Sequence, residues 1–111
     1  MKTYNIYGNI LISEVGKELR RIIKFEKTAF KVLTGYGSKT GVSQSKNAAL
    51  KSLRKMKKEN LIDGYIVGDS LKKLLTDPNS DEYEAKMKYE RRLRNDKDYG
   101  NPGIIFVFVS K

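Results

Sequence analysis

Hydrophobic residues at the start of the chain recur in two ways: at every second position, as in a strand, and at every third or fourth position, as in a helix. Tyr4–Tyr7 alternates between polar and apolar residues and predicts a first strand, which Gly8 and Asn9 end. Thr28–Thr34 is β-branched and aromatic and predicts a second strand. Between these strands, apolar residues recur every three to four positions and predict one face of an amphipathic helix: Leu11, Val15, Leu19, Ile22 and Ile23.

The same alternation of strand and helix continues through the middle of the chain. A second helix is predicted after a loop over residues 35–41, with Ser43 or Ser45 as its N-cap and Asn60 near its end. Its apolar face is formed by Ala49, Leu50, Leu53 and Met56. Leu61–Val67 then predicts a third strand.

Residues 68–98 interrupt this alternation and form a predicted helical insert. Asp69 is placed to cap a short helix with Leu71, Leu74 and Leu75 on it, and Asp77-Pro78-Asn79 breaks that helix. Ser80 or Asp81 then opens a longer charged helix, whose thin apolar stripe is Tyr83, Met87, Tyr89 and Leu93.

The last segment differs from the other strands because it is apolar at every position. Residues 98–103 predict a turn, and Ile104–Val109 follows as a strand that is covered on both faces and lies in the interior of a sheet. The order is β-α-β-α-β, the helical insert at about residues 68–98, then a final β. It predicts one α/β domain over residues 1–111, a two-layer sandwich with a mixed, largely parallel four-stranded sheet.

Charge adds the strongest indication of function. Lys and Arg number 23 against 13 acidic residues, a formal net charge of +10. This excess predicts an anionic partner, with RNA or DNA favoured over a membrane surface; a merely solvating surface is the alternative. The sequence shows neither a signal peptide nor a membrane-spanning stretch, so we expect a cytoplasmic protein without a membrane partner.

The absence of two residue types excludes several kinds of site. The chain has no Cys and no His, so thiolate metal sites, disulfides and the usual general base at neutral pH are excluded. Asp96, Asp98 and Asn101 resemble a metal cluster, but next to Gly-Asn-Pro-Gly they favour a turn.

The glycine-rich loop between the second strand and the second helix is the first candidate binding site. Backbone N–H groups at such a turn attract anions. The loop does not fit the Walker A motif, Gly-x4-Gly-Lys-Ser/Thr, or the dinucleotide-binding motif, Gly-x-Gly-x-x-Gly. The loop's candidate nucleic-acid contacts are Thr34, Gly35, Tyr36, Gly37, Ser38, Lys39, Thr40 and Ser43, and the helix adds Lys46, Lys51, Arg54 and Lys55. A tight turn followed by an ordinary charged helix face is the alternative.

Two motifs resemble those of a known family. Thr34-Gly35-Tyr36-Gly37 matches a Thr-Gly-x-Gly loop motif, and Tyr4–Gly8 stands where a first-strand Leu-Asp-x-His-Gly motif is expected. Together they resemble the Smr (small MutS-related) domain. The resemblance implies a sandwich like the C-terminal domain of bacterial translation initiation factor three. It also implies binding of DNA or RNA, nicking endonuclease activity in several members, and action on ribosomes in some.

The first-strand motif departs from the family at its reactive positions, where Asn5 replaces Asp and Tyr7 replaces His. Asn cannot act as a base, and Tyr is a poor one near neutral pH. If the domain cuts nucleic acid, Tyr7, Asn5 and Lys39 are the candidate catalytic residues. A divalent metal could then be held by Asn5 with Asp96 or Asp98. The alternatives are a binding-only module and a protein–protein adaptor that uses the insert; the oligomeric state stays open.

Overall fold

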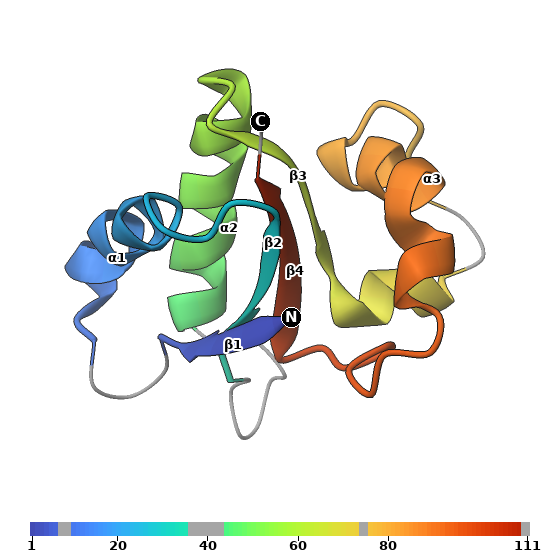
Figure 1. Cartoon of the computed structure of the whole chain (residues 1–111), viewed down its shortest axis with the longest axis horizontal. Helices are drawn as coiled ribbons and strands as arrows, with labels where there is room; N and C mark the ends of the chain where they lie inside the picture. Colours follow the sequence, from blue (N-terminus) through green and yellow to red (C-terminus); the bar gives the residue numbers. More distant parts are fainter. Residues whose placement is uncertain (7–9, 36–43, 74–75, 110–111) are drawn as a thin grey trace.

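The computed structural model describes residues 1–6, 10–35, 44–73 and 76–109 (Figure 1). Their elements, in chain order, are strand β1 (Lys2–Asn5), 3-10 helix η1 (Ile12–Glu14), helix α1 (Val15–Ile22), strand β2 (Ala29–Leu33), helix α2 (Gln44–Lys58), strand β3 (Ile62–Val67), 3-10 helix η2 (Gly68–Lys72), helix α3 (Asp81–Leu93) and strand β4 (Ile104–Val109). The predicted order of strands and helices is therefore confirmed. None of the described helices is long and apolar enough to cross a membrane.

The strands form one sheet in the order β1-β2-β4-β3. β1 pairs with β2 in parallel, whereas β4 is antiparallel to both β2 and β3. The mixed four-stranded sheet is confirmed, but the expectation that it is largely parallel is wrong, because only one pair of neighbours is parallel. β1, β2 and β3 do run in the same direction; β4 lies between β2 and β3 and separates them.

The interior position predicted for the last strand is confirmed. From Ile104 to Phe108 every residue of β4 is buried, and alternate side chains enter the cores on the two faces of the sheet. An apolar strand gains most from burial when both its faces and both its edges are covered. This gain gives β4 its central place in the sheet.

Helices cover both faces of the sheet (Figure 1). α1 and α2 pack on one face, with Leu19, Leu53 and Met56 in the core beneath them. These two helices and the sheet form the two layers of the predicted sandwich. α3, from the insert, covers the opposite face through a smaller core that includes Ala85, Leu93 and Phe106.

The inward face of α3 differs from the predicted stripe. Ser80 is confirmed as its N-cap, since its hydroxyl accepts a hydrogen bond of 3.1 Å from the Tyr83 N–H. Ala85, Tyr89 and Leu93, four residues apart, face the sheet. The prediction that Met87 belongs to the inward stripe is wrong, because Met87 is 72% exposed.

Two contacts of small and flat groups hold α3 close to the sheet. The Tyr89 ring stacks on the Phe108 ring of β4, with centroids 3.7 Å apart and planes 2° from parallel. Gly64 of β3 faces Ala85, and a Cβ on Gly64 would lie 3.2 Å from the Ala85 Cβ. The short side chains therefore set how near the helix lies to β3.

Candidate nucleic-acid interface

The described residues of the two motifs lie side by side at one end of the strand pair β1–β2. Parallel strands end on the same side, and Asn5 is in register with Leu33. The Ile6 N–H also donates a hydrogen bond of 3.1 Å to the Leu33 carbonyl. Asn5, at the end of β1, is consequently a neighbour of the first residues of the glycine-rich loop, Thr34 and Gly35.

Thr34 holds the beginning of this loop and does not face solvent. It is fully buried, and its N–H donates a hydrogen bond of 2.8 Å to the Gly103 carbonyl, just before β4. Its hydroxyl lies 3.1 Å from the same carbonyl oxygen. Gly35 follows with a φ of 66°, a conformation that glycine adopts without steric cost. Thr34 therefore acts as a positioning residue for the loop.

Several predicted site residues lie outside the described part of the chain. These are Tyr7, Tyr36, Gly37, Ser38, Lys39, Thr40 and Ser43. The predicted roles of these residues in binding or cleavage stay predictions.

Helix α2 presents a continuous cationic surface. Its inward residues are Ser45, Ala49, Leu53 and Met56, and its sequence contains no acidic residue. On the solvent side, four basic residues are all exposed, and we call them the basic face: Lys51, Arg54, Lys55 and Lys58. Lys46 lies in the first turn of α2 and is half-buried.

Most of the basic face is not neutralised by the protein's own carboxylates. Over the described residues, no acidic oxygen lies within 4.0 Å of the ammonium groups of Lys51, Lys55 or Lys58. Lys57, on another side of α2, is by contrast 3.3 Å from Glu84. Clustered cations that form no ion pair produce a local positive potential that attracts a polyanion, although Arg54 and Lys58 also line a hollow with Asp81 and Glu82.

A groove runs between the N-terminal parts of the two helices on this side of the sheet. We call it the α1–α2 groove; its volume is about 490 Å³. It is lined from the η1 and α1 side by Ile12, Ser13 and Gly16, and from the α2 side by Gln44, Asn47, Ala48, Lys51 and Ser52. Lys51 belongs both to this groove and to the basic face, so the two surfaces are continuous.

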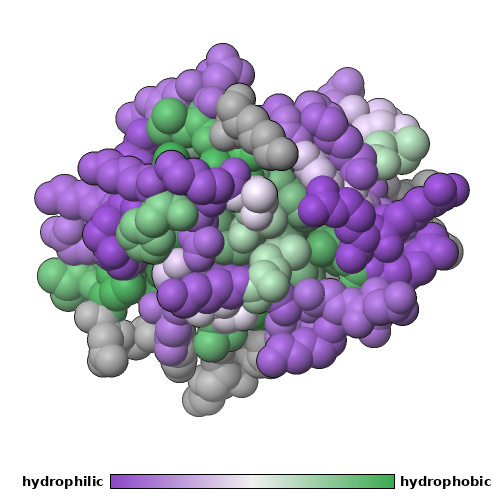
Figure 2. Space-filling view, in the orientation of Figure 1, coloured by the Kyte–Doolittle hydropathy of each residue, from purple (hydrophilic) through white to green (hydrophobic). Residues whose placement is uncertain are grey.

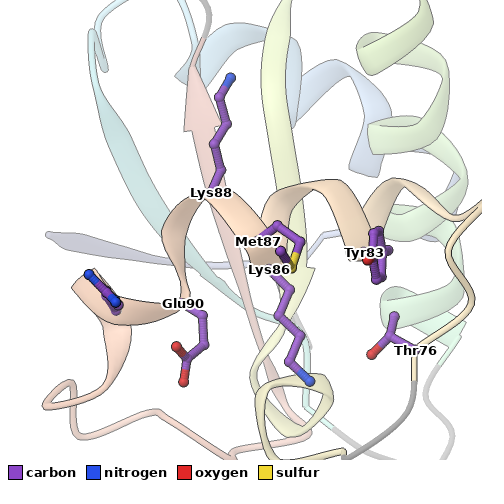
Figure 3. A pocket seen from close by; sticks show the side chains of 7 residues that line it. Thr76, Tyr83, Lys86, Met87, Lys88 and Glu90 are labelled. Atoms are coloured by element: carbon purple, nitrogen blue, oxygen red, sulfur yellow. The ribbon is translucent and has the colours of Figure 1, made fainter.

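A second hollow lies on the outer side of α3 and has a volume of about 640 Å³ (Figure 3). Its lining includes Tyr83 and Met87, which are one helical turn apart and both exposed. Lys86 and Arg91 add positive charge beside them. In Figure 3 the Lys88 side chain points away from the other labelled side chains. We call this the α3 hollow. On the face of the molecule shown in Figure 2, hydrophobic residues form separate patches among hydrophilic ones.

The acidic residues considered as metal ligands bind a lysine instead. The ammonium of Lys31, on β2, lies 2.7 Å from Asp96 Oδ1 and 2.8 Å from Asp98 Oδ2. Among the described residues, no three acidic side chains converge as a cation site would require. The suggested metal site of Asn5 with Asp96 or Asp98 is therefore not supported, because the ammonium already occupies the position between the two carboxylates.

The turn predicted for these residues is confirmed. Asp96 Oδ1 accepts a hydrogen bond of 2.9 Å from the Asp98 N–H, and Asn101 Oδ1 accepts one of the same length from the Gly103 N–H. Side-chain acceptors of this kind fix a turn in place of backbone partners. Sequence reasoning missed Lys31, although a lysine in the middle of the apolar segment Ala29–Leu33 indicates a buried partner of opposite charge.

Burial and ion pairing act against each other in this cluster. Burial lowers the pKa of the Lys31 ammonium, but hydrogen bonds to two carboxylates outweigh it and raise the pKa above its usual value. Burial likewise opposes ionisation of Asp98, and hydrogen bonds from Lys31 and Asn101 hold the pKa of that carboxyl below its usual value. Lys31 and Asp98 are thus charged at neutral pH, and the contacts of the Lys31 ammonium link β2 to the turn after α3.

The described site combines an uncompensated basic helix face, a groove beside it and a glycine-rich loop whose start is fixed by Thr34. Comparison of the chain with family models, with curated proteins and with solved structures finds no match.

Proposed function

We propose that this chain is a nucleic-acid-binding domain that contacts the phosphate backbone of RNA or DNA through the basic face and the glycine-rich loop before α2. The observation that carries the proposal is the basic face itself, with three lysines that no acidic side chain of the described residues neutralises. The net charge of +10 and the Smr-like motifs add support. Ribosomal RNA is one polymer with the chemistry that this surface would recognise.

The dimensions of the basic face suit a nucleic-acid strand. From Lys51 to Lys58 the helix advances about 10 Å, at about 1.5 Å per residue. Phosphates of one strand of duplex DNA follow one another at about 3.4 Å along the axis. The four side chains can therefore reach about three phosphates.

Binding without cleavage is the activity that the residues support best. The position of the family's acid is occupied by Asn5, which cannot take up a proton. Position 7 holds Tyr in place of His, and a tyrosine with its reference pKa of about 10 is a poor base near pH 7. The alternative is a nuclease that uses Tyr7, Asn5 and Lys39, and it is tested separately below.

The salt dependence of binding tests the proposal. The affinity of the full chain for end-labelled RNA and DNA hairpins is measured by fluorescence anisotropy between about 50 and 200 mM salt. Replacing Lys51, Arg54 and Lys55 by Ala is expected to reduce the slope of log K against log salt by about 2 to 3, because each phosphate contact contributes about 0.9.

A matched variant separates this surface from net charge. Lys24, Lys27 and Lys97 are exposed and lie outside α2, so replacing them by Ala removes the same charge elsewhere. This control is expected to keep most of the wild-type slope. Equal losses in both triple variants would contradict the assignment to the basic face, and absence of binding at low salt would contradict nucleic-acid binding altogether.

A second candidate function, a protein–protein adaptor, is favoured by the α3 hollow. Tyr83 and Met87 are exposed beside it, and exposed methionine side chains adapt readily to a partner's surface. In this alternative, Met87→Glu abolishes partner binding while the basic-face triple variant does not. The opposite result favours the nucleic-acid proposal.

A further inference from the structure

The α1–α2 groove extends the basic face with side chains of a different chemistry. Gln44, Asn47 and Lys51 are spaced by three and four residues, so they lie on one face of α2. Along that face the amides come first, and the cations follow toward the C-terminal end. We propose that the groove receives an unpaired nucleobase of a bound strand whose phosphates lie on the basic face. This inference rests on the proposed function and specifies single-stranded nucleic acid as its ligand.

The groove lining suits a flat, partly polar ring. Gly16 and Ala48 present little side chain, and Ile12 is apolar and 42% exposed, so apolar surface is available to cover a base. α1 and α2 approach each other closely here, as the position of Gly16 shows: a Cβ on this glycine would lie 2.9 Å from Ser52 Oγ. Burying one face of an unpaired ring against such surface is favourable whichever base it belongs to.

The polar side chains of the lining can pair with base edges. Gln44 and Asn47 each carry an amide oxygen that accepts and an N–H₂ group that donates hydrogen bonds. Within the part of the chain that the structure describes, neither amide side chain is engaged in a hydrogen bond with the protein. Bases in a duplex present their pairing edges to each other, whereas an unpaired base offers them to a protein.

Lys51 links the base and its backbone. It lines the groove and also belongs to the basic face, where Arg54 follows one turn later. A base in the groove would therefore place its adjoining phosphates beside these two cations. The groove volume of about 490 Å³ leaves room for a whole base rather than for an ion alone.

The test compares two single strands of equal charge that differ only in their bases, with a duplex as a third ligand of higher charge. Binding of the full chain to a labelled oligo(dT) strand is measured beside an abasic deoxyribose-phosphate strand of equal length and beside the corresponding duplex. The base-bearing strand is expected to bind roughly fivefold more tightly than the abasic strand, about what one hydrogen bond to the edge of the base contributes. The Gln44→Ala/Asn47→Ala variant should lose this preference and keep the salt slope.

The outcomes separate this inference from the function on which it rests. Equal affinity for the base-bearing and abasic strands overturns the base site but leaves phosphate binding intact. Base preference that survives in the double variant overturns the location in the groove, with Asn95→Ala as the control for an exposed amide elsewhere. Absence of binding to every strand at low salt overturns the proposed function, and the inference with it.

Discussion

The ammonium of Lys31 lies 2.7 Å from Asp96 Oδ1, and this ion pair joins the middle of β2 to the turn after α3. Asp98 completes the cluster at 2.8 Å. All three side chains are largely shielded from water, with 5% of the Lys31 side chain exposed. The pair therefore connects residues that are 65 positions apart in the chain and attaches the insert to the sheet.

Removal of this lysine is expected to destabilise the fold. Lys31→Ala leaves two poorly solvated carboxylates without their cation, and the expected loss is about 3 kcal/mol in the free energy of unfolding. Urea unfolding followed by circular dichroism measures it. Replacing Lys31 by Met together with Asp96→Asn and Asp98→Asn should recover most of the loss, because no buried charge then remains. A wild-type midpoint in Lys31→Ala would show that the ion pairs contribute nothing.

The stabilisation from this cluster should disappear in acid. The pKa of Asp98 is lower in the folded protein than in the unfolded chain, so its contribution is present above the unfolded pKa of about 4 and is lost as the pH falls through the folded pKa. The difference in unfolding free energy between wild type and Lys31→Met is expected to be largest near neutral pH and to shrink as the pH falls toward and below about 4. A difference that does not change with pH would contradict an electrostatic origin.

Gly68 is expected to tolerate no side chain. A Cβ there would lie 2.4 Å from the Asn101 carbonyl oxygen and 2.7 Å from that of Asp98, and both are backbone atoms that cannot rotate away. Gly68→Ala should cost about 2 kcal/mol in thermal or urea unfolding. Gly16→Ala is the matched control: its Cβ meets only the Ser52 side chain, whose close Oγ can turn aside, and alanine favours the helix. Equal effects of the two substitutions would contradict this reasoning.

The Tyr65 hydroxyl is expected to lose its proton at a higher pH than an ordinary tyrosine. Burial and the hydrogen bond from its hydroxyl to Asp81, at 2.9 Å, raise its pKa to about 12. Since the unfolded pKa is about 10, the folded state is stabilised below that value and loses this contribution as the pH rises toward 12. Phenolate absorbance measured against pH should show a component near pH 12, to which Tyr4 also contributes, and Tyr65→Phe should reduce this component by the share of one tyrosine. A variant whose titration curve matches wild type would contradict the assignment.

Incubation with RNA and DNA hairpins, with Mg²⁺ or Mn²⁺, should leave the substrates intact on a denaturing gel. The reason is that Asn5 and Tyr7 replace the proton-transferring residues of the family motif. Lys39→Ala and Tyr7→Phe proteins run alongside the wild type. Cuts that disappear in these variants would show a nuclease that works without histidine, whereas cuts that persist in them would indicate a contaminant.

The periodicity of the sequence predicted the elements well because each is long enough to show its own repeat. Asn60 lies just after the end of α2, close to where the sequence predicted it, with a φ of 61° that Asn tolerates better than most residues. The pairing of the strands could not be predicted in the same way. The alternation of strands and helices predicts that β3 runs in the same direction as β1 and β2, but it does not reveal that β4 lies between β2 and β3.

The side chains on α3 show a second limit of sequence reasoning. Tyr83 and Met87 are four residues apart, as are Ala85 and Tyr89, so two stripes on the helix have the spacing of a buried face. The structure buries the second, because Tyr89 stacks on Phe108 and Ala85 fits against Gly64. Such choices depend on partners far away in the chain, as does the ion pair of Lys31.

The central position of β4 also determines when this protein can fold during its synthesis. β2 and β3 have no direct contact in the sheet and are joined only through Ile104–Val109. Until the ribosome has released that segment, both strands keep an unpaired edge that could pair with another chain. Folding of the sheet must therefore wait until Ile104–Val109 has left the ribosome, and the nascent chain depends on a slow closing step between distant segments.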